Sequence, residues 1–223
     1  MNRMPVVYEE LLRKLESNPI RLWQLASVRY MTMPERVYES FKKQGQLSEW
    51  FTPLMSYQIP TSAGKRRDLM VEFMPSVPRL ALFRNWTSIP IDAQLDQLAE
   101  PAYNPRQQVL VDHQATLGSM QGNPGVESLE PTEITRSRVV VEVQVDEPVI
   151  LRFSQRIQPG WHVFVNGKEQ PLLTLDYLVM GVKLDAGHQV VEFRAPQSRA
   201  ALYILGLGLV ACVSGGMLVS RKS

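Results

Sequence analysis

One uncharged segment near the carboxyl end constrains this chain more than any other feature. Residues 200–220 read AALYILGLGLVACVSGGMLVS and contain no Asp, Glu, Lys, Arg or His. That is about the 20 apolar residues an α-helix needs to cross the hydrocarbon layer of a bilayer. Arg199 precedes the segment, and Arg221 and Lys222 follow it. We therefore predict a transmembrane helix over residues 200–220 that contacts the lipid bilayer. The alternative is a buried helix of a soluble domain.

The amino-terminal end has no comparable apolar stretch. Residues 1–19 read MNRMPVVYEELLRKLESNP, and Glu9, Glu10 and Glu16 interrupt any hydrophobic core of an export signal. The basic residues that flank the apolar run, Arg194 and Arg199 before it and Arg221 and Lys222 after it, are balanced. The charge rule therefore does not fix the orientation of the predicted helix in the membrane.

Composition excludes two classes of protein. The net charge of +2 and a longest basic run of three residues, Lys65–Arg67, argue against a nucleic-acid partner. The single cysteine, Cys212, excludes an internal disulfide framework. With 44% hydrophobic residues among its 223, the chain has the composition of a folded protein.

Hydrophobic periodicity divides the chain into four parts. Residues 1–50 show helical spacing and predict a helical segment. Residues 51–130 predict a mixed β/α segment, with a helix over 91–99 and a loop over 113–132. Residues 131–196 alternate in short runs that predict an antiparallel β-sandwich. The fold class is thus α+β, mainly β, with a jelly-roll-like sandwich and the helix at 200–220.

The segment IQPGWHVFVNGKEQP, residues 157–171, poses a choice between a hairpin and a binding site. Asn166-Gly167 predicts a two-residue type I′ turn, because both positions need φ > 0 and Asn and Gly tolerate it best. Trp161 begins the preceding strand. It either covers one end of the sandwich core or stacks on a ligand.

Few residues are spaced for catalysis or metal binding. His113, His162 and His188 lie far apart in sequence and lack metal-ligand spacing. Carboxylates that could act in pairs on a glycoside fall on a helix or on strand and turn positions, where solvated surface is the simpler reading; they are Glu9, Glu10, Glu142, Asp146 and Glu147. We expect no catalytic residue, no metal site and no cofactor in this chain.

Aromatic residues suggest sugar binding as a candidate function. Trp86, Trp161 and Tyr177 are the candidate glycan-binding residues, because aromatic faces stack on sugar rings. The competing interpretation is that all three fill the apolar core, as large aromatic residues commonly do.

Four segments in order resemble the carboxyl-terminal region of the bacterial YfhO family of membrane proteins. The last of them contains Pro159-Gly160-Trp161, Asn166-Gly167, Tyr177 to Val182 and Asp185-Ala186-Gly187, as the family pattern does, and precedes an apolar terminal run. The segments are LWQLASVRYMTM (22–33), VPRLALFRNW (77–86), LAEPAYNPRQQVLVD (98–112) and QPGWHVFVNGKEQPLLTLDYLVMGVKLDAGHQVVEFRAPQS (158–198).

The resemblance implies a location and a role. Family members are multi-span proteins related to glycosyltransferases of the GT-C type that use lipid-linked sugars, and their multi-span catalytic half has no counterpart here. The resemblance implies a non-catalytic extracytoplasmic module of the bacterial inner membrane, with residues 1–195 outside. Its implied partners are glycan, lipid-linked sugar or the multi-span remainder of the same protein. The alternatives are a tail-anchored cytosolic interaction domain and a membrane-tethered carbohydrate-active enzyme.

Overall fold

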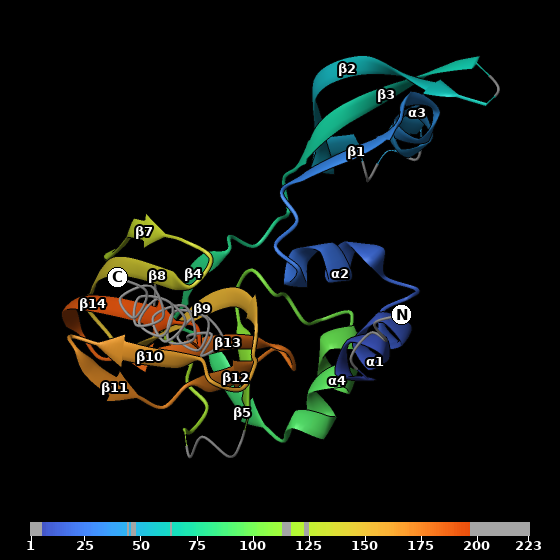
Figure 1. The fold of residues 1–223 in the computed structure, drawn as a ribbon. Helices are drawn as coiled ribbons and strands as arrows, with labels where there is room; N and C mark the ends of the chain where they lie inside the picture. The colour runs from blue at the N-terminus through green and yellow to red at the C-terminus, as the bar shows by residue number, and fades with distance from the viewer. Residues whose placement is uncertain are drawn as a thin grey trace, which may run out of the picture.

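Strands dominate the part of the molecule that the computed structural model describes, which is residues 6–43, 45, 48–62, 64–112, 117–122 and 125–196 (Figure 1). Almost all strand pairs are antiparallel, and β5 with β6 is a parallel pair. The prediction of a mainly β protein built on antiparallel sheets is confirmed.

The helices carry apolar side chains at helical spacing on one face, as the sequence predicts. They are α1 (Val6–Lys14), α2 (Pro19–Leu25), α3 (Glu35–Lys43), α4 (Ile91–Ala99) and a 3₁₀ turn, η1 (Ser48–Trp50). The strands are β1 (Tyr30–Pro34), β2 (Phe51–Thr61), β3 (Gly64–Phe73), β4 (Leu80–Phe83), β5 (Trp86–Ile89), β6 (Val109–Asp112), β7 (Glu127–Ile134), β8 (Arg138–Val145), β9 (Val149–Arg156), β10 (His162–Val165), β11 (Lys168–Gln170), β12 (Leu173–Leu175), β13 (Val179–Leu184) and β14 (Gly187–Arg194).

Two large sheets pack against each other and share one core. The first has the strand order β11-β10-β14-β8-β7, and the second β4-β9-β13-β12-β6-β5. In β8 the buried residues alternate with half-buried and exposed ones, because one face of the strand meets the core and the other meets solvent. Val141 and Val191 of the first sheet and Leu151 and Val182 of the second are fully buried in the same cluster. We call these two sheets, with α1 and α4, the two-sheet body.

The second sheet is assembled from both halves of the sequence. β4, from the segment 51–130, pairs with β9, with Leu80 opposite Phe153. β6 pairs with β12 through Val111 and Leu175. The sheet therefore continues across residue 131, where the sequence suggested the start of a separate sandwich.

Helices cover part of the second sheet. Leu11 of α1, Leu15 directly after α1, Leu98 of α4 and Leu25 of α2 form one buried cluster with Leu110 of β6. Figure 1 shows α1 and α4 lying beside each other at this end of the molecule. This arrangement explains why strands such as β9 are buried at consecutive positions rather than at every second one.

A smaller unit stands apart from the two-sheet body. It is a three-stranded sheet of order β1-β3-β2, with α3 against it, and we call it the small module (Figure 1). Phe51, Val71 and Phe73 form its core, and Trp23 of α2 packs on them. The helix α2 thus touches both units, because Leu25 belongs to the cluster beneath α1 and α4.

The predicted hairpin at residues 166–167 is confirmed. Asn166 has φ 49° and Gly167 has φ 76°, as a type I′ turn requires. The turn joins β10 to β11, and Val165 lies opposite Lys168.

Two segments differ from the sequence prediction. Residues 127–132, predicted as loop, belong to β7, which pairs with β8 at the edge of its sheet. β7 is mostly exposed, so its sequence lacks the apolar alternation by which strands are recognised. β2 was not predicted either, because most of its residues are exposed too.

The predicted transmembrane helix at residues 200–220 lies outside the described residues. Among the helices of the described part, none combines the length and the apolarity that crossing a bilayer needs.

Candidate functional site

The three aromatic residues suggested for glycan binding lie in three different hydrophobic clusters. Trp86 belongs to the cluster around β5 and β6, Trp161 packs against the core between the two large sheets, and Tyr177 lies under α1 and α4. They do not form a common surface, so the structure does not bring these residues together as a platform.

Each of the three has a local structural partner. Trp86 is 4% exposed, and its indole Nε1 donates a hydrogen bond of 2.7 Å to the carbonyl of Gly118. Trp161 makes an edge-on contact with Phe153, with ring centroids 6.1 Å apart. The Tyr177 hydroxyl donates a hydrogen bond to Glu10, and burial followed by this bond raises the pKa of Tyr177 to about 12. All three aromatic rings therefore contribute to packing.

The histidines within the described residues are surface residues of the two-sheet body. His162 Nδ1 lies 2.6 Å from a carboxylate oxygen of Glu169, and His188 Nε2 lies 3.6 Å from one of Glu142. Both imidazoles are more than half exposed. Within the described residues, no three His, Cys, Asp or Glu side chains are grouped as metal ligands. His113 lies outside that part.

A buried ionic cluster connects the second sheet to the end of α2. Arg152 of β9 and Asp176, which follows β12, have side chains that are 1% and 2% exposed. The Arg152 guanidinium Nε donates to Asp176 Oδ2 over 2.9 Å, and its Nη2 donates to the carbonyl of Leu25 over 2.7 Å. The pair therefore joins the second sheet to the end of α2.

Both oxygens of the Asp176 carboxylate accept hydrogen bonds. Its Oδ1 accepts hydrogen bonds from the Tyr103 hydroxyl at 2.9 Å and from the backbone N–H of Leu110 at 3.0 Å. Burial, followed by the Asp176 charge, holds the pKa of Tyr103 well above its ordinary value. These bonds join Asp176 to β9, to β6 and to the loop after α4, so the cluster holds these elements together.

The backbone at this cluster adopts an uncommon conformation. Asp176 and Tyr177 have φ values of 46° and 70°, in the left-handed region that non-glycine residues rarely occupy. The side-chain oxygen of Gln94, a residue of α4, accepts a hydrogen bond of 2.6 Å from the Tyr177 N–H. The surrounding contacts therefore fix a strained turn, as is common where a side chain must be aimed at a particular partner.

A small cavity of about 150 Å³ opens beside the cluster. Its walls combine apolar side chains of α1 and α2, among them Leu11 and Leu22, with Arg152, Arg156 and Ser154 of β9. Of its polar wall residues, Arg152 and Asp176 are bonded to each other, whereas the Arg156 side chain makes no hydrogen bond or ion pair within the described residues.

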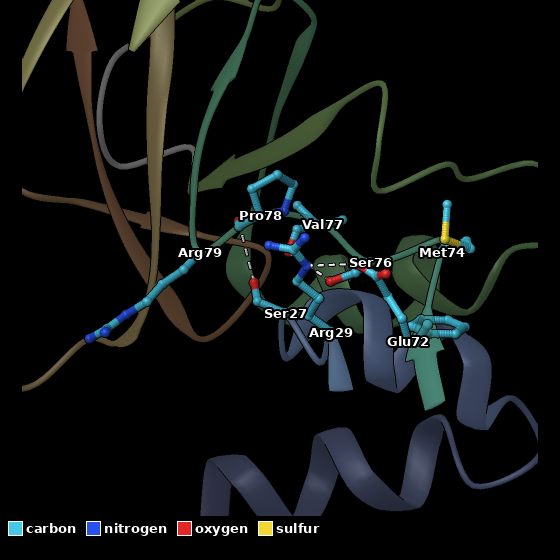
Figure 2. A pocket seen from close by; sticks show the side chains of 9 residues that line it. Ser27, Arg29, Glu72, Met74, Ser76, Val77, Pro78 and Arg79 are labelled. Atoms are coloured by element: carbon cyan, nitrogen blue, oxygen red, sulfur yellow. Dashed lines mark hydrogen bonds and ion pairs between the residues drawn. The ribbon is translucent and has the colours of Figure 1, made fainter. Parts of the chain in front are cut away.

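A second depression lies where the small module joins the two-sheet body. This cleft of about 370 Å³ is bordered by the two connecting segments, from Ser27 to Arg29 and from Phe73 to Arg79. Figure 2 shows Arg29 and Glu72 pointing toward each other, with 2.9 Å between Arg29 Nε and Glu72 Oε1. The Ser27 hydroxyl donates to the carbonyl of Pro78 over 3.4 Å. These bonds tie the two connections together.

A third and larger groove, of about 590 Å³, separates α2 and η1 from the loop that follows α4. Arg21 and Gln24 line it from α2, Trp50 from η1, and Asn104 and Gln107 from the loop. It is the only one of these three depressions lined by several side-chain amides together with a partly exposed indole.

The ionic cluster was not predicted, although the sequence carries a signal for it. Arg152 stands inside the apolar run VILRF and Asp176 inside LLTLDYLVM. An isolated charge within an apolar strand is rarely buried without a partner, so two opposite charges in such runs predict a buried pair. Arg21, in PIRLWQL, carries no comparable signal, because short helices often present a solvated arginine.

Comparison with protein-family models, with curated proteins and with solved structures gives no match for this chain.

Proposed function

We propose that this chain is a non-catalytic extracytoplasmic module of a YfhO-like membrane protein, linked to the assembly of cell-envelope glycan or polysaccharide. The proposed module is a jelly-roll-like β-sandwich tethered by a single helix at residues 200–220. Its support in sequence is the ordered set of segments that resemble the family, together with the uncharged run.

The observation that supports the proposal most is the place of β14 in its sheet. β14 lies between β10 and β8, in the middle of the five-stranded sheet. Beyond its last residue, Arg194, the chain is still held by a hydrogen bond of 2.8 Å from Ala195 N–H to the Ser137 carbonyl. A membrane helix that follows the central strand of a packed sheet would be attached to a rigid body rather than to a loose end.

The distance between the sheet and the proposed helix is short. Pro196 and Ala200 are four peptide units apart, which spans on the order of 14 Å when fully extended. The proposed module therefore lies close to the membrane surface, where it can contact lipid-linked or partner molecules. The engaged state of the buried ionic cluster agrees with a role in positioning rather than in catalysis.

A cysteine-accessibility experiment tests the location. Lys168 is exposed in the β10–β11 hairpin and its side chain makes no hydrogen bond or ion pair within the described residues, so Lys168→Cys in a Cys212→Ser background places one reporter thiol on the surface. We expect a membrane-impermeant maleimide to label it in intact spheroplasts. Labelling only after lysis would contradict the extracytoplasmic location and favour a tail-anchored cytosolic domain.

A second variant tests the membrane attachment alone. Leu209→Arg places a charge near the middle of the proposed helix, which opposes membrane insertion by about 2.5–3.5 kcal/mol. We expect the parent chain to stay with membranes after alkaline extraction and the variant to be partly released. Release of the parent chain would refute the tether.

A further inference from the structure

The groove between α2, η1 and the loop after α4 contains a buried arginine without a counter-ion. Arg21 is 7% exposed. Its Nη1 donates to the carbonyl of Leu98 over 2.7 Å and to that of Glu100 over 3.4 Å, and its guanidinium lies 5.3 Å over the ring of Tyr103. These partners are carbonyl dipoles and a π face, so none of them neutralises the charge.

The other buried arginines of the described residues provide the contrast. Arg152 is paired with Asp176 at 2.9 Å, and Arg84 with Asp146 at 2.5 Å. No carboxylate among the described residues lies within 4 Å of Arg21. The segments outside the described residues contain no Asp or Glu side chain. Arg21 is therefore the buried arginine whose anionic partner no side chain of this chain provides.

Arg21 lines the groove, and two of its guanidinium nitrogens have no hydrogen-bond partner within the described residues. Its Nε is enclosed without a hydrogen-bond partner, and its Nη2 makes no hydrogen bond within the described residues. Burial lowers the pKa of Arg21, which is the physical sign of an uncompensated charge. Because burying a cation without a partner is unfavourable, an anion that reaches the groove gains from the pairing.

The rim of the groove adds a second kind of recognition. Gln24 and Gln107 have side-chain amides without a protein partner within the described residues, and Asn104 has a free amide nitrogen. An amide offers both donors and an acceptor, which matches the mixed hydrogen bonding of a hydroxyl group. Trp50 is half-buried and supplies an apolar wall. The volume of about 590 Å³ suits one or two sugar units.

We propose that this groove binds a sugar that carries a carboxylate or a phosphate, with the anionic group on Arg21 and the hydroxyl groups on the amides of Gln24, Asn104 and Gln107. The inference uses residues 18–107 alone, so it does not depend on how the chain is placed in a membrane.

Titration of the full chain in mild detergent, followed by calorimetry, tests the proposal with three probes. We expect D-glucuronate and glucose 6-phosphate to bind at least tenfold more tightly than glucose. The carboxylate and phosphate probes separate the two possible anions. Equal affinity for glucose, or no binding of either anion, would overturn the proposal.

Two variants locate the site. Arg21→Gln is expected to weaken binding of the anionic sugars at least tenfold while leaving the affinity for glucose unchanged. Replacing the buried Arg21 also changes the packing around it, so a second variant is needed. Gln107→Glu adds a repelling charge at an exposed position of the rim. Gln107→Glu should keep the melting temperature and weaken anion binding about fivefold.

A matched control excludes a general charge effect. Gln58→Glu makes the same change at an exposed position of β2 in the small module, outside the groove. It should leave anion binding unchanged. Equal effects of Gln58→Glu and Gln107→Glu, or no effect of Gln107→Glu, would show that the anion binds elsewhere.

Discussion

The small module and the two-sheet body are both β structures, but they are assembled from contacts of different range. In the small module, β2 and β3 are joined by a tight hairpin, and the whole sheet comes from residues 30–73. In the two-sheet body, Leu80 pairs with Phe153, and one sheet places β9, β13 and β12 between β4 on one side and β6 and β5 on the other. Local pairing closes short loops, whereas distant pairing must offset a larger loss of chain entropy.

The difference also appears in how each unit uses charge. The small module has ion pairs at the surface, as between Arg29 and Glu72 and between Arg67 and Glu35. The two-sheet body encloses Arg152 and Asp176 completely. Since surface pairs contribute little and buried pairs are strongly destabilising when broken, the two units should respond differently to the loss of a charge.

The largest expected effect is the loss of the buried pair in the two-sheet body. Asp176→Asn keeps the shape and tolerates the left-handed backbone, but it leaves Arg152 buried without a counter-charge. We expect the free energy of unfolding to fall by about 3–5 kcal/mol, measured by urea denaturation. Glu35→Gln in the small module is the control, because the pair of Glu35 with Arg67 is exposed, and it should cost about 1 kcal/mol or less. Similar costs for both would remove the contrast between the units.

A smaller loss of stability should be confined to the small module. Trp23 contacts Phe51 and Phe73 at ring-centroid distances of 6.2 and 5.7 Å. Trp23→Ala removes this packing, and because the indole is half-buried we expect a loss of about 2 kcal/mol. Amide hydrogen exchange should show lower protection in β1 and β3, with β8 and β14 unchanged.

The matched variant for this experiment is Trp161→Ala. Trp161 packs on Phe153 in the two-sheet body. Trp161→Ala should therefore lower amide protection in β8 and β14 and leave the protection of β1 and β3 unchanged. A uniform loss of protection in either variant would mean that the two units unfold as one.

The smallest expected effect depends on pH and tests the surface of the two-sheet body. Hydrogen bonds from Arg194, and then Arg138, lower the pKa of Glu192 to about 2. The charged Glu192 therefore stabilises the fold at pH above about 4.5, its ordinary value, and this contribution is lost as the pH falls toward 2. Glu192→Gln should cost on the order of 1 kcal/mol at pH 7 and nothing near pH 2.

Thermal unfolding across this pH range measures the effect. Glu130→Gln on β7 is the control, because Glu130 is exposed and has no ion pair within the described residues. An equal and pH-independent cost for both variants would argue against the assigned role of Glu192.

Local features of the fold were predictable from sequence. The helical spacing of Ile91, Leu95 and Leu98 and the Asn166-Gly167 turn depend on neighbouring residues alone, and both are present. β2 and β7 were missed, because exposed strands have little apolar alternation. What defines a strand of that kind is the partner strand, which the local sequence does not contain.

The candidate site was less predictable than the fold. Trp86, Trp161 and Tyr177 were chosen by residue type, and the structure places them in three separate clusters, each with a local partner. Arg21 was not singled out, since its burial depends on Leu98, Glu100 and Tyr103, about 80 residues away. A missing counter-ion can be recognised only when the whole environment of a side chain is known.

The central position of β14 has a consequence for the order of folding. β10 and β8 do not pair with each other; each pairs with β14, which is synthesised after both. While the nascent chain still lacks β14, β8 can pair with β7 alone and β10 with β11 alone, and both hairpins expose a free edge. During translation the small module can therefore complete its sheet early, whereas the five-stranded sheet must wait for its last strand and depends on protection from aggregation until then.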